Sequence, residues 1–146
     1  MFSQIKPENF VPQFVASGVF LVYDNSFYLF KRSSYKKFGA NKWALCAGGV
    51  EEGESFEASA KRELYEETGI QLGLESFLDE KVFYHADGEE SGTKWHVFLY
   101  HFSKPPVITL NDEHTEYKLV SKEESFLLDL MDGEKEVIES FFIKVT

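Results

Sequence analysis

Three glutamates, Glu63, Glu66 and Glu67, lie close together in one short stretch of the sequence. The residues around them predict a helix over 55–68, on which they stand at i, i+3 and i+4 and share one face within an arc of about 100°. Like charges at this spacing destabilise a helix by roughly 0.2–0.5 kcal/mol per pair, so a helix built only for stability would place lysines among them. The arrangement fits either a solvated acidic surface or a site for hard divalent cations, which prefer several carboxylate oxygens.

Neighbouring residues favour the metal-site interpretation. Arg62 could orient a carboxylate through a bidentate pair, and Glu54 adds a further acidic group. The segment 48–53, predicted as a loop, contains three glycines that allow sharp turns and a close approach of the backbone. Adjacent carboxylates raise each other's proton affinity, and a bound dication would reverse that effect.

Together these residues fill a long pattern of fixed spacing. It consists of Gly, five residues, Glu, seven residues, Arg-Glu, an aliphatic residue, any residue, Glu-Glu, any residue, Gly and an aliphatic residue. This stretch resembles the Nudix box, the signature of Nudix hydrolases. One departure precedes it, where many members have Pro-Gly and this chain has Cys46-Ala47. The positions filled are Gly48, Glu54, Arg62, Glu63, Leu64, Glu66, Glu67, Gly69 and Ile70.

The resemblance implies a role for each matched residue. The acidic residues of the box are the implied catalytic set, with Mg²⁺ or Mn²⁺ as the cofactor. Arg62 is implied to hold the acidic residues in place, and Gly48 and Gly69 to be structural. The backbone carbonyl of Ala47 matches a position that often ligates metal in the family. The implied metal ligands in the box are Glu63, Glu66 and Glu67, with Glu54 contributing directly or through water.

The implied chemistry is metal-assisted hydrolysis of a diphosphate bond. Metal ions would neutralise the diphosphate, polarise phosphorus and lower the pKa of an attacking water. A glutamate would take the proton from that water. Glu63, Glu66 and a downstream glutamate all stay open for this role.

A second acidic segment, residues 112–118, follows the strand predicted over 95–102. Glu113 is the preferred further metal ligand and Glu116 the second choice, while an exposed acidic turn is the simpler alternative. The pattern Glu-His, two residues, Tyr, a basic residue and an aliphatic resembles diadenosine tetraphosphate hydrolases and nucleoside or dihydroneopterin triphosphate pyrophosphohydrolases. The match is partial, because a Trp is usual where Leu119 stands.

Positive charge is concentrated upstream of the box. Arg32 and Lys31 end a predicted strand that should abut the glycine loop, and relatives often place a basic residue there against substrate phosphates. We therefore expect these two residues to bind substrate. The rest of the cluster has solvation as its simpler explanation: Lys36, Lys37 and Lys42.

Other side chains offer weaker signals. Tyr35, Phe38 and Trp95 could stack on a base, although most aromatic residues here are expected in the core. Cys46 is predicted to be a small buried hydrophobic residue, because nothing near it in the sequence would activate a nucleophile. The four histidines show no zinc-binding spacing and are predicted to be structural.

The elements that must position these residues alternate irregularly between strand and helix. This order predicts an α/β fold, and the resemblance specifies a Nudix-type α/β/α sandwich with a mixed central β-sheet. Ser55 is the expected N-cap of the box helix, and Gly69 suits the left-handed position just past its end. Ser121 with Glu124 forms a capping box. A turn is expected at Asn25-Ser26 and a hairpin loop over 87–93. Strands are predicted over 14–23, 27–30, 43–46, 77–85, 95–102 and 117–120, and a final helix over 133–144.

Composition limits the protein class. The chain of 146 residues predicts a single domain with its own core. A net charge of −10 argues against binding a nucleic acid polymer, although metals can bridge acidic groups to polyphosphate. No apolar run is long enough for a membrane helix, and neither a signal peptide nor an intrachain disulfide is expected. A cytoplasmic location is the default prediction, and a homodimer is open because many relatives dimerise.

The expected function is Mg²⁺-dependent hydrolysis of a nucleoside diphosphate linked to another moiety. A nucleoside triphosphate or dinucleoside polyphosphate is the first choice of substrate, and a nucleotide sugar the second. Two different classes stay open: an isopentenyl diphosphate isomerase-like enzyme, which would need a catalytic cysteine, and a Nudix-like domain that binds nucleotide without cutting it.

Overall fold

The computed structural model describes residues 2–73, 77–86 and 92–142. Eight strands form one sheet in the order β1-β6-β7-β2-β3-β4, with β5 pairing on β2 and β8 on β3. β2 and β7 run parallel and the other pairs are antiparallel, so the sheet is mixed, as predicted. The strands are β1 (Phe2–Ser3), β2 (Phe14–Tyr23), β3 (Ser26–Arg32), β4 (Trp43–Ala44), β5 (Cys46–Gly49), β6 (Phe77–Ala86), β7 (Gly92–His101) and β8 (His114–Val120).

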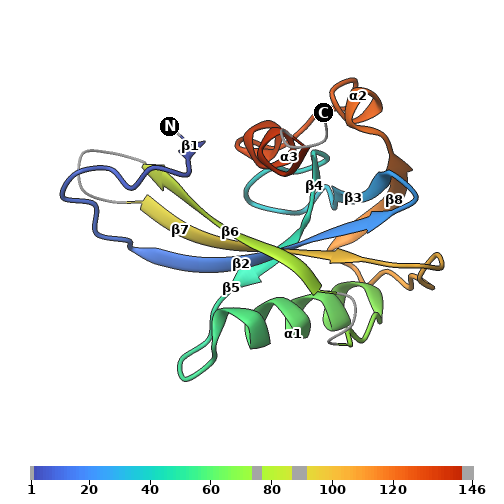
Figure 1. Cartoon of the computed structure of the whole chain (residues 1–146), viewed down its shortest axis with the longest axis horizontal. Coiled ribbons are helices and arrows are strands. Elements are labelled where there is room, and N and C mark those ends of the chain that lie inside the picture. The colour runs from blue at the N-terminus through green and yellow to red at the C-terminus, as the bar shows by residue number, and fades with distance from the viewer. Residues whose placement is uncertain (1, 74–76, 87–91, 143–146) are drawn as a thin grey trace.

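Helices cover both faces of this sheet (Figure 1). Helix α1 (Phe56–Thr68) lies on one face, against β2 and β5, whereas α2 (Lys122–Ser125) and α3 (Glu134–Phe142) lie on the other. The α/β/α sandwich expected from the sequence is therefore confirmed. Among the described residues, none of these helices has the length and apolar character that crossing a membrane requires.

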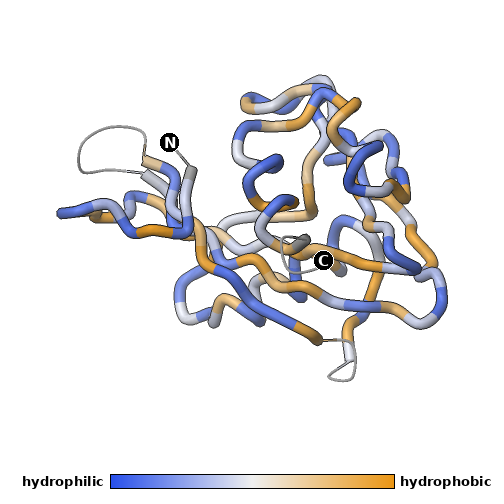
Figure 2. Tube along the Cα trace, turned by 45° about the horizontal axis from the view of Figure 1, so that its top comes forward, coloured by the Kyte–Doolittle hydropathy of each residue, from blue (hydrophilic) through white to orange (hydrophobic). Residues whose placement is uncertain are grey.

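Strand β2 explains why the sandwich has two cores. Its side chains alternate between the faces, so Val19 and Leu21 join the core under α1, while Phe20 joins the core under α3. Leu64 of α1 completes the first core and Ile138 of α3 the second, and both are fully buried. Figure 2 shows hydrophobic stretches, in orange, along the strands in the middle of the molecule.

The first hairpin differs by one residue from its prediction. Asp24 and Asn25 form the turn, with φ of 51° and 63°, and Ser26 already belongs to β3. Two central residues with positive φ match the twist of a two-residue hairpin, and Asp and Asn tolerate that conformation better than most residues do.

The predicted strand over 43–46 is two strands, and the glycine loop begins later than expected. Leu45 separates β4 from β5, and β5 continues through Gly48 and Gly49 because both residues pair with β2. The turn between β5 and α1 therefore starts at Val50. β8 also begins earlier than predicted, at His114, because it pairs with almost the whole of β3.

The remaining elements agree closely with prediction. β7 spans Gly92–His101 instead of 95–102, so the predicted hairpin loop is shorter, and its residues 87–91 lie outside the described part of the chain. The last two residues of the predicted final helix, 143 and 144, also lie outside it. The capping box of Ser121 and Glu124 is present, with both reciprocal hydrogen bonds.

Candidate active site

Helix α1 presents the acidic residues in a fixed register. The Ser55 side chain accepts a hydrogen bond from the backbone N–H of Ala58 and caps the N-terminus. Gly69 ends the helix in the left-handed region, with φ of 76°, and its N–H donates to the carbonyl of Tyr65. Both caps were predicted, and together they fix the turns that carry Glu63, Glu66 and Glu67.

Three carboxylates converge at the C-terminal half of this helix. Glu63, Glu67 and Glu113 each offer an oxygen, and these oxygens all lie within 4.8 Å of one another. We call them the three-glutamate cluster. Backbone hydrogen bonds bring Glu113 to the helix, because the N–H of Thr109 donates to the carbonyl of Thr68 and that of Asn111 to the carbonyl of Glu67.

The three-glutamate cluster carries more negative charge than the positive charge beside it can balance. Glu67 is only 2% exposed, and its Oε2 has no hydrogen-bond partner among the described residues. Burial and the nearby charges of Glu113 and Glu63 raise the pKa of Glu67 to about 9. Burial also raises the pKa of Glu63. A divalent cation would compensate these charges, so the residues present fit a metal ion.

Arg62 holds a second set of carboxylates beside the cluster. Its guanidinium donates to Glu54 at 2.7 and 3.1 Å, to Glu66 at 3.0 and 3.1 Å, and to the carbonyl of Gly49 at 3.2 Å. The hydrogen bond from Arg62 lowers the pKa of Glu54 to about 2. Arg62 also reaches Glu63 at 3.2 Å, so one side chain ties the strand end, the loop and the helix together.

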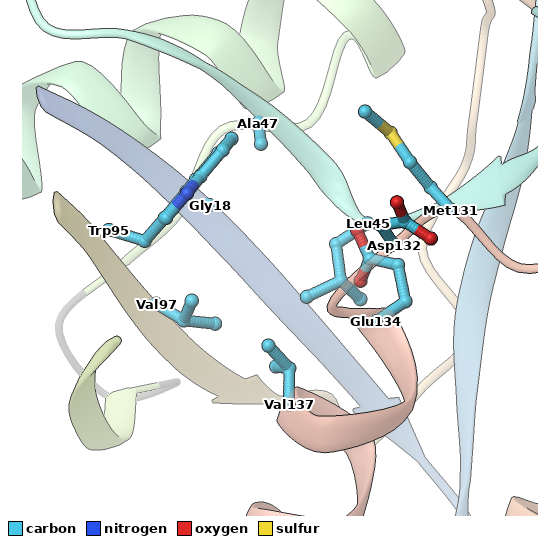
Figure 3. Close-up of a pocket in the computed structure, with 9 residues that line it drawn as sticks. All are labelled: Gly18, Leu45, Ala47, Trp95, Val97, Met131, Asp132, Glu134 and Val137. Carbon is cyan, nitrogen blue, oxygen red and sulfur yellow. The ribbon is translucent and has the colours of Figure 1, made fainter. Parts of the chain in front are cut away.

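Gly48 allows this packing. A Cβ added to Gly48 would overlap the carboxyl group of Glu63, whereas one added to Gly49 would have no heavy atom within 4 Å. Ala47, between Gly48 and Cys46, points its side chain to the other face of the sheet (Figure 3). Strand β5 therefore separates the face of the carboxylates from the face of a pocket.

That pocket lies between the sheet and the start of α3 (Figure 3). Trp95 forms one wall, Met131 and Asp132 approach from the segment that leads into α3, and Glu134 is the first residue of that helix. Glu134 Oε2 has no hydrogen-bond partner among the described residues, and burial raises the pKa of this carboxyl to about 8. An apolar cavity with a few polar groups suits a small organic ligand.

The basic residues upstream of the box make contacts within the chain, and substrate binding by Lys31 and Arg32 stays a prediction. Lys31 forms an ion pair with Glu116 at 3.5 Å, and the Arg32 Nε donates to the carbonyl of Phe38 at 3.1 Å. Lys36, for which solvation was the simpler explanation, instead donates to Glu113 at 2.6 Å. Lys36 is thus the lysine that contacts the three-glutamate cluster.

Comparison with known proteins identifies the family. A family model described as the NUDIX domain matches residues 12–141 of the chain. The chain belongs to the Nudix family. Together with the box, this membership makes it a Nudix hydrolase.

Individual Nudix proteins resemble the chain over most of their length. The nucleoside triphosphatase NudI of Salmonella newport (strain SL254) is 34% identical over 114 residues, covering 73% of this chain and 81% of that protein. The MutT protein from Methanosarcina mazei Go1 superposes with a TM-score of 0.74 at 25% identity, over 91% of this chain and 95% of that one. A C. elegans Ap4A hydrolase has the same fold, with a TM-score of 0.72 at 17% identity, over 90% and 97% of the two chains.

The Nudix box residues divide into two groups in space. Glu63 and Glu67 join Glu113, which the sequence favoured over Glu116. Glu66 and Glu54 instead form ion pairs with Arg62. These are contacts of the kind predicted for an arginine that holds acidic residues in place. The roles of all these residues as metal ligands or catalytic groups stay predictions.

The sequence did not point to the pocket. Trp95 was named as a stacking candidate and lines it, whereas Tyr35 and Phe38 are 62% and 68% exposed. Asp132 and Glu134 were missed entirely. The signal that could have found them is a pair of acidic residues around Gly133, just before the amphipathic final helix.

Cys46 and His114 are buried next to the cluster. Cys46 is fully buried, and desolvation raises the pKa of its thiol, so the thiolate that a nucleophile needs is disfavoured. His114 Nδ1 lies 3.4 Å from Glu67 Oε1, and burial lowers the pKa of His114 to about 4. A neutral imidazole there adds no positive charge to the cluster.

Proposed function

We propose that this Nudix hydrolase cleaves a nucleoside triphosphate and uses Mg²⁺, or Mn²⁺, as its cofactor. The observation that carries the proposal is the three-glutamate cluster, in which the buried Glu67 carboxyl group has an unpartnered oxygen. Carboxylate oxygens are the ligands that both ions prefer.

The residues of the site would then share the work as follows. Glu63, Glu67 and Glu113 hold the ion, with the backbone carbonyl of Ala47 as a further ligand. When bound, the ion neutralises phosphate oxygens and lowers the pKa of the attacking water. Arg62 keeps the carboxylates in register through its hydrogen bonds to Glu54 and Glu66, which assigns Glu54 a positioning role.

Two residues are candidates to accept the proton of the attacking water. Glu66 is on the same helix face as the cluster and its side chain is 46% exposed, so water can reach it. Glu63 is closer to the other two carboxylates, which places it beside the water that the ion would bind. The two variants Glu63→Gln and Glu66→Gln separate these roles, because only a metal ligand should also lose metal affinity.

The pocket would accept the nucleoside. Trp95 offers a ring for stacking on a base, and Asp132 and Glu134 offer polar groups to its edge. The similarity to a nucleoside triphosphatase over 73% of the chain supports this substrate class. A dinucleoside polyphosphate is the second candidate, because the segment from Glu113 to Lys118 partly matches the pattern of those hydrolases.

A substrate panel tests the proposal. Ribo- and deoxyribonucleoside triphosphates, dinucleoside polyphosphates and nucleotide sugars would be assayed with Mg²⁺, with Mn²⁺ and with EDTA, and the products separated by chromatography. We expect turnover of a triphosphate that EDTA abolishes. No turnover of any substrate, together with no Mn²⁺ binding by calorimetry, would overturn the proposal. The cytoplasmic location and a homodimer stay predictions, and light scattering after size exclusion tests the latter.

A further inference from the structure

One lysine already neutralises part of the three-glutamate cluster. The Nζ of Lys36 lies 2.6 Å from Glu113 Oε1, and its side chain is only 22% exposed. Lys36 thus sits at the carboxylates as a monovalent counter-cation.

A single positive charge does not satisfy the cluster. Three carboxylates converge, but only Glu113 is bonded to Lys36, and the Oε2 of Glu67 still lacks a hydrogen-bond partner among the described residues. A divalent ion held by the three carboxylates would have to share Glu113 with Lys36 or take its place there. Lys36 and the ion are therefore competitors for one carboxylate.

Lys36 can leave Glu113 without a change in the surrounding loop. The N–H of Lys36 donates to the carbonyl of Ser33, and the guanidinium of Arg32 holds the carbonyl of Phe38, so the loop backbone is fixed by its own hydrogen bonds. The ammonium stands on a flexible four-carbon stem. A rotation of the side chain is enough to carry the charge from Glu113 to a ligand beside it.

We propose that Lys36 is an internal counter-cation that holds Glu113 until a divalent ion binds, and that its ammonium then pairs with the diphosphate of the substrate. This inference rests on the proposed function. Of the two basic residues expected at the substrate, Lys31 forms an ion pair with Glu116, and the Nε of Arg32 donates to the carbonyl of Phe38. Lys36 is the member of the basic cluster whose charge already lies at the carboxylates.

The two parts of the inference predict opposite effects of one substitution. In Lys36→Met, calorimetry should give about 3–10-fold tighter binding of Mn²⁺ alone, because a competing cation is gone. With saturating Mn²⁺, binding of imidodiphosphate, a non-hydrolysable diphosphate, should be about tenfold or more weaker, because a charge-assisted hydrogen bond is lost. Lys37→Met is the matched control. It removes the same charge from an exposed neighbour, whose ammonium lies over the Phe38 ring, and should change neither affinity more than about twofold.

Any other result would contradict part or all of the inference. Unchanged or weaker Mn²⁺ binding by Lys36→Met would overturn the counter-cation role, and unchanged imidodiphosphate binding would overturn the phosphate role. If Lys36 only stabilised its loop, the Lys36→Met variant would bind both Mn²⁺ and imidodiphosphate more weakly than the wild type. If the wild-type chain bound no Mn²⁺, the proposed function itself would fail, which distinguishes the two failures.

A second measurement avoids dependence on the variant's fold. Reductive ¹³C-dimethylation labels lysines while keeping their charge, and the Lys36 signal is assigned by its loss in Lys36→Met or in Lys36→Arg. Titration of the wild-type chain with Mg²⁺ should shift this signal, while the Lys37 signal stays in place. A Lys36 signal that does not respond to saturating Mg²⁺ would contradict release from Glu113.

Discussion

Gly48 lies directly against the carboxylate of Glu63. A Cβ on Gly48 would come closer than 3.0 Å to the Cδ and both carboxylate oxygens of Glu63. Gly48 belongs to strand β5 and has no positive φ, so the first glycine of the box is not required by a turn. It is required because any side chain there would displace a residue of the three-glutamate cluster.

Gly48→Ala therefore tests whether the position of Glu63 matters. We expect a loss of about 10²-fold in kcat/KM, because small displacements of catalytic groups have effects of this size, with weaker Mn²⁺ binding in parallel. Gly49→Ala is the matched control, since a Cβ there meets no heavy atom within 4 Å. Equal activity of the two variants would contradict the role of the contact.

Glu67→Gln should remove hydrolysis and keep the fold. The variant loses the buried carboxylate, so we expect kcat to fall about 10²–10³-fold and Mn²⁺ affinity to fall with it. Glu57→Gln on the same helix is the control, because Glu57 lies in the first turn, away from the cluster, and forms an ion pair with Lys61. Circular dichroism should show the same helix content in both variants. An unaffected rate in Glu67→Gln would rule out the metal site.

Arg62→Lys keeps the charge but loses the geometry. A lysine cannot bond Glu54, Glu66 and the carbonyl of Gly49 together. We expect a loss of about 1–3 kcal/mol in the free energy of unfolding and of about 10–100-fold in activity, measured by urea denaturation and by steady-state kinetics. Lys61→Met, on the neighbouring helix position, should change activity little. If Arg62→Lys matched the wild type in both assays, the network would be dispensable.

Glu134→Gln should change how stability depends on pH. The folded pKa of about 8 lies above the ordinary value of 4.5, so ionisation of Glu134 destabilises the fold as pH rises through this window. The glutamine side chain does not ionise. The variant should therefore unfold with the same free energy as the wild type below pH 4.5, become increasingly more stable than the wild type between pH 4.5 and 8, and keep a constant advantage above pH 8. At pH 9 we expect the variant to be more stable than the wild type by about 1–2 kcal/mol in the free energy of unfolding. The difference is small for so large a pKa shift because part of the Glu134 side chain stays in contact with solvent. A difference that does not change with pH would contradict the raised pKa.

Cys46→Ala distinguishes a hydrolase from an isomerase-like enzyme with a catalytic cysteine. The thiol is fully buried and packs in the core under α1 with Leu64. We expect unchanged kcat and KM and a loss of about 1 kcal/mol in stability, measured by kinetics and thermal denaturation. Loss of activity with the fold intact would reopen the isomerase-like alternative.

Local signals predicted much of the fold. Ser55 and Gly69 placed both ends of α1, and a buried run rich in Val and Phe placed β2 at Phe14–Tyr23. Partners far away in the sequence explain the misses. Gly48 and Gly49 are a strand because β2 lies beside them, which no short window of sequence reveals.

The same limit applies to the site. The spacing of the box placed Glu63 and Glu67 together, because a helix converts spacing into geometry. It could not place Lys36 against Glu113, since these residues are 77 positions apart and meet only when β3 pairs with β8. Nor could the spacing show that Glu66 lies outside the cluster, because that depends on the direction in which the Arg62 side chain points.

Strand β5 gives the protein two surfaces that can change independently. Cys46 and Gly48 face the carboxylates under α1, while Ala47 between them faces the pocket. Under the proposed function, a substitution at a pocket-facing position would alter which molecule enters while the neighbouring glycine still accommodates Glu63. In evolutionary terms, such a partition lets new substrate preferences arise on one side of a strand while the chemistry on the other side is inherited unchanged.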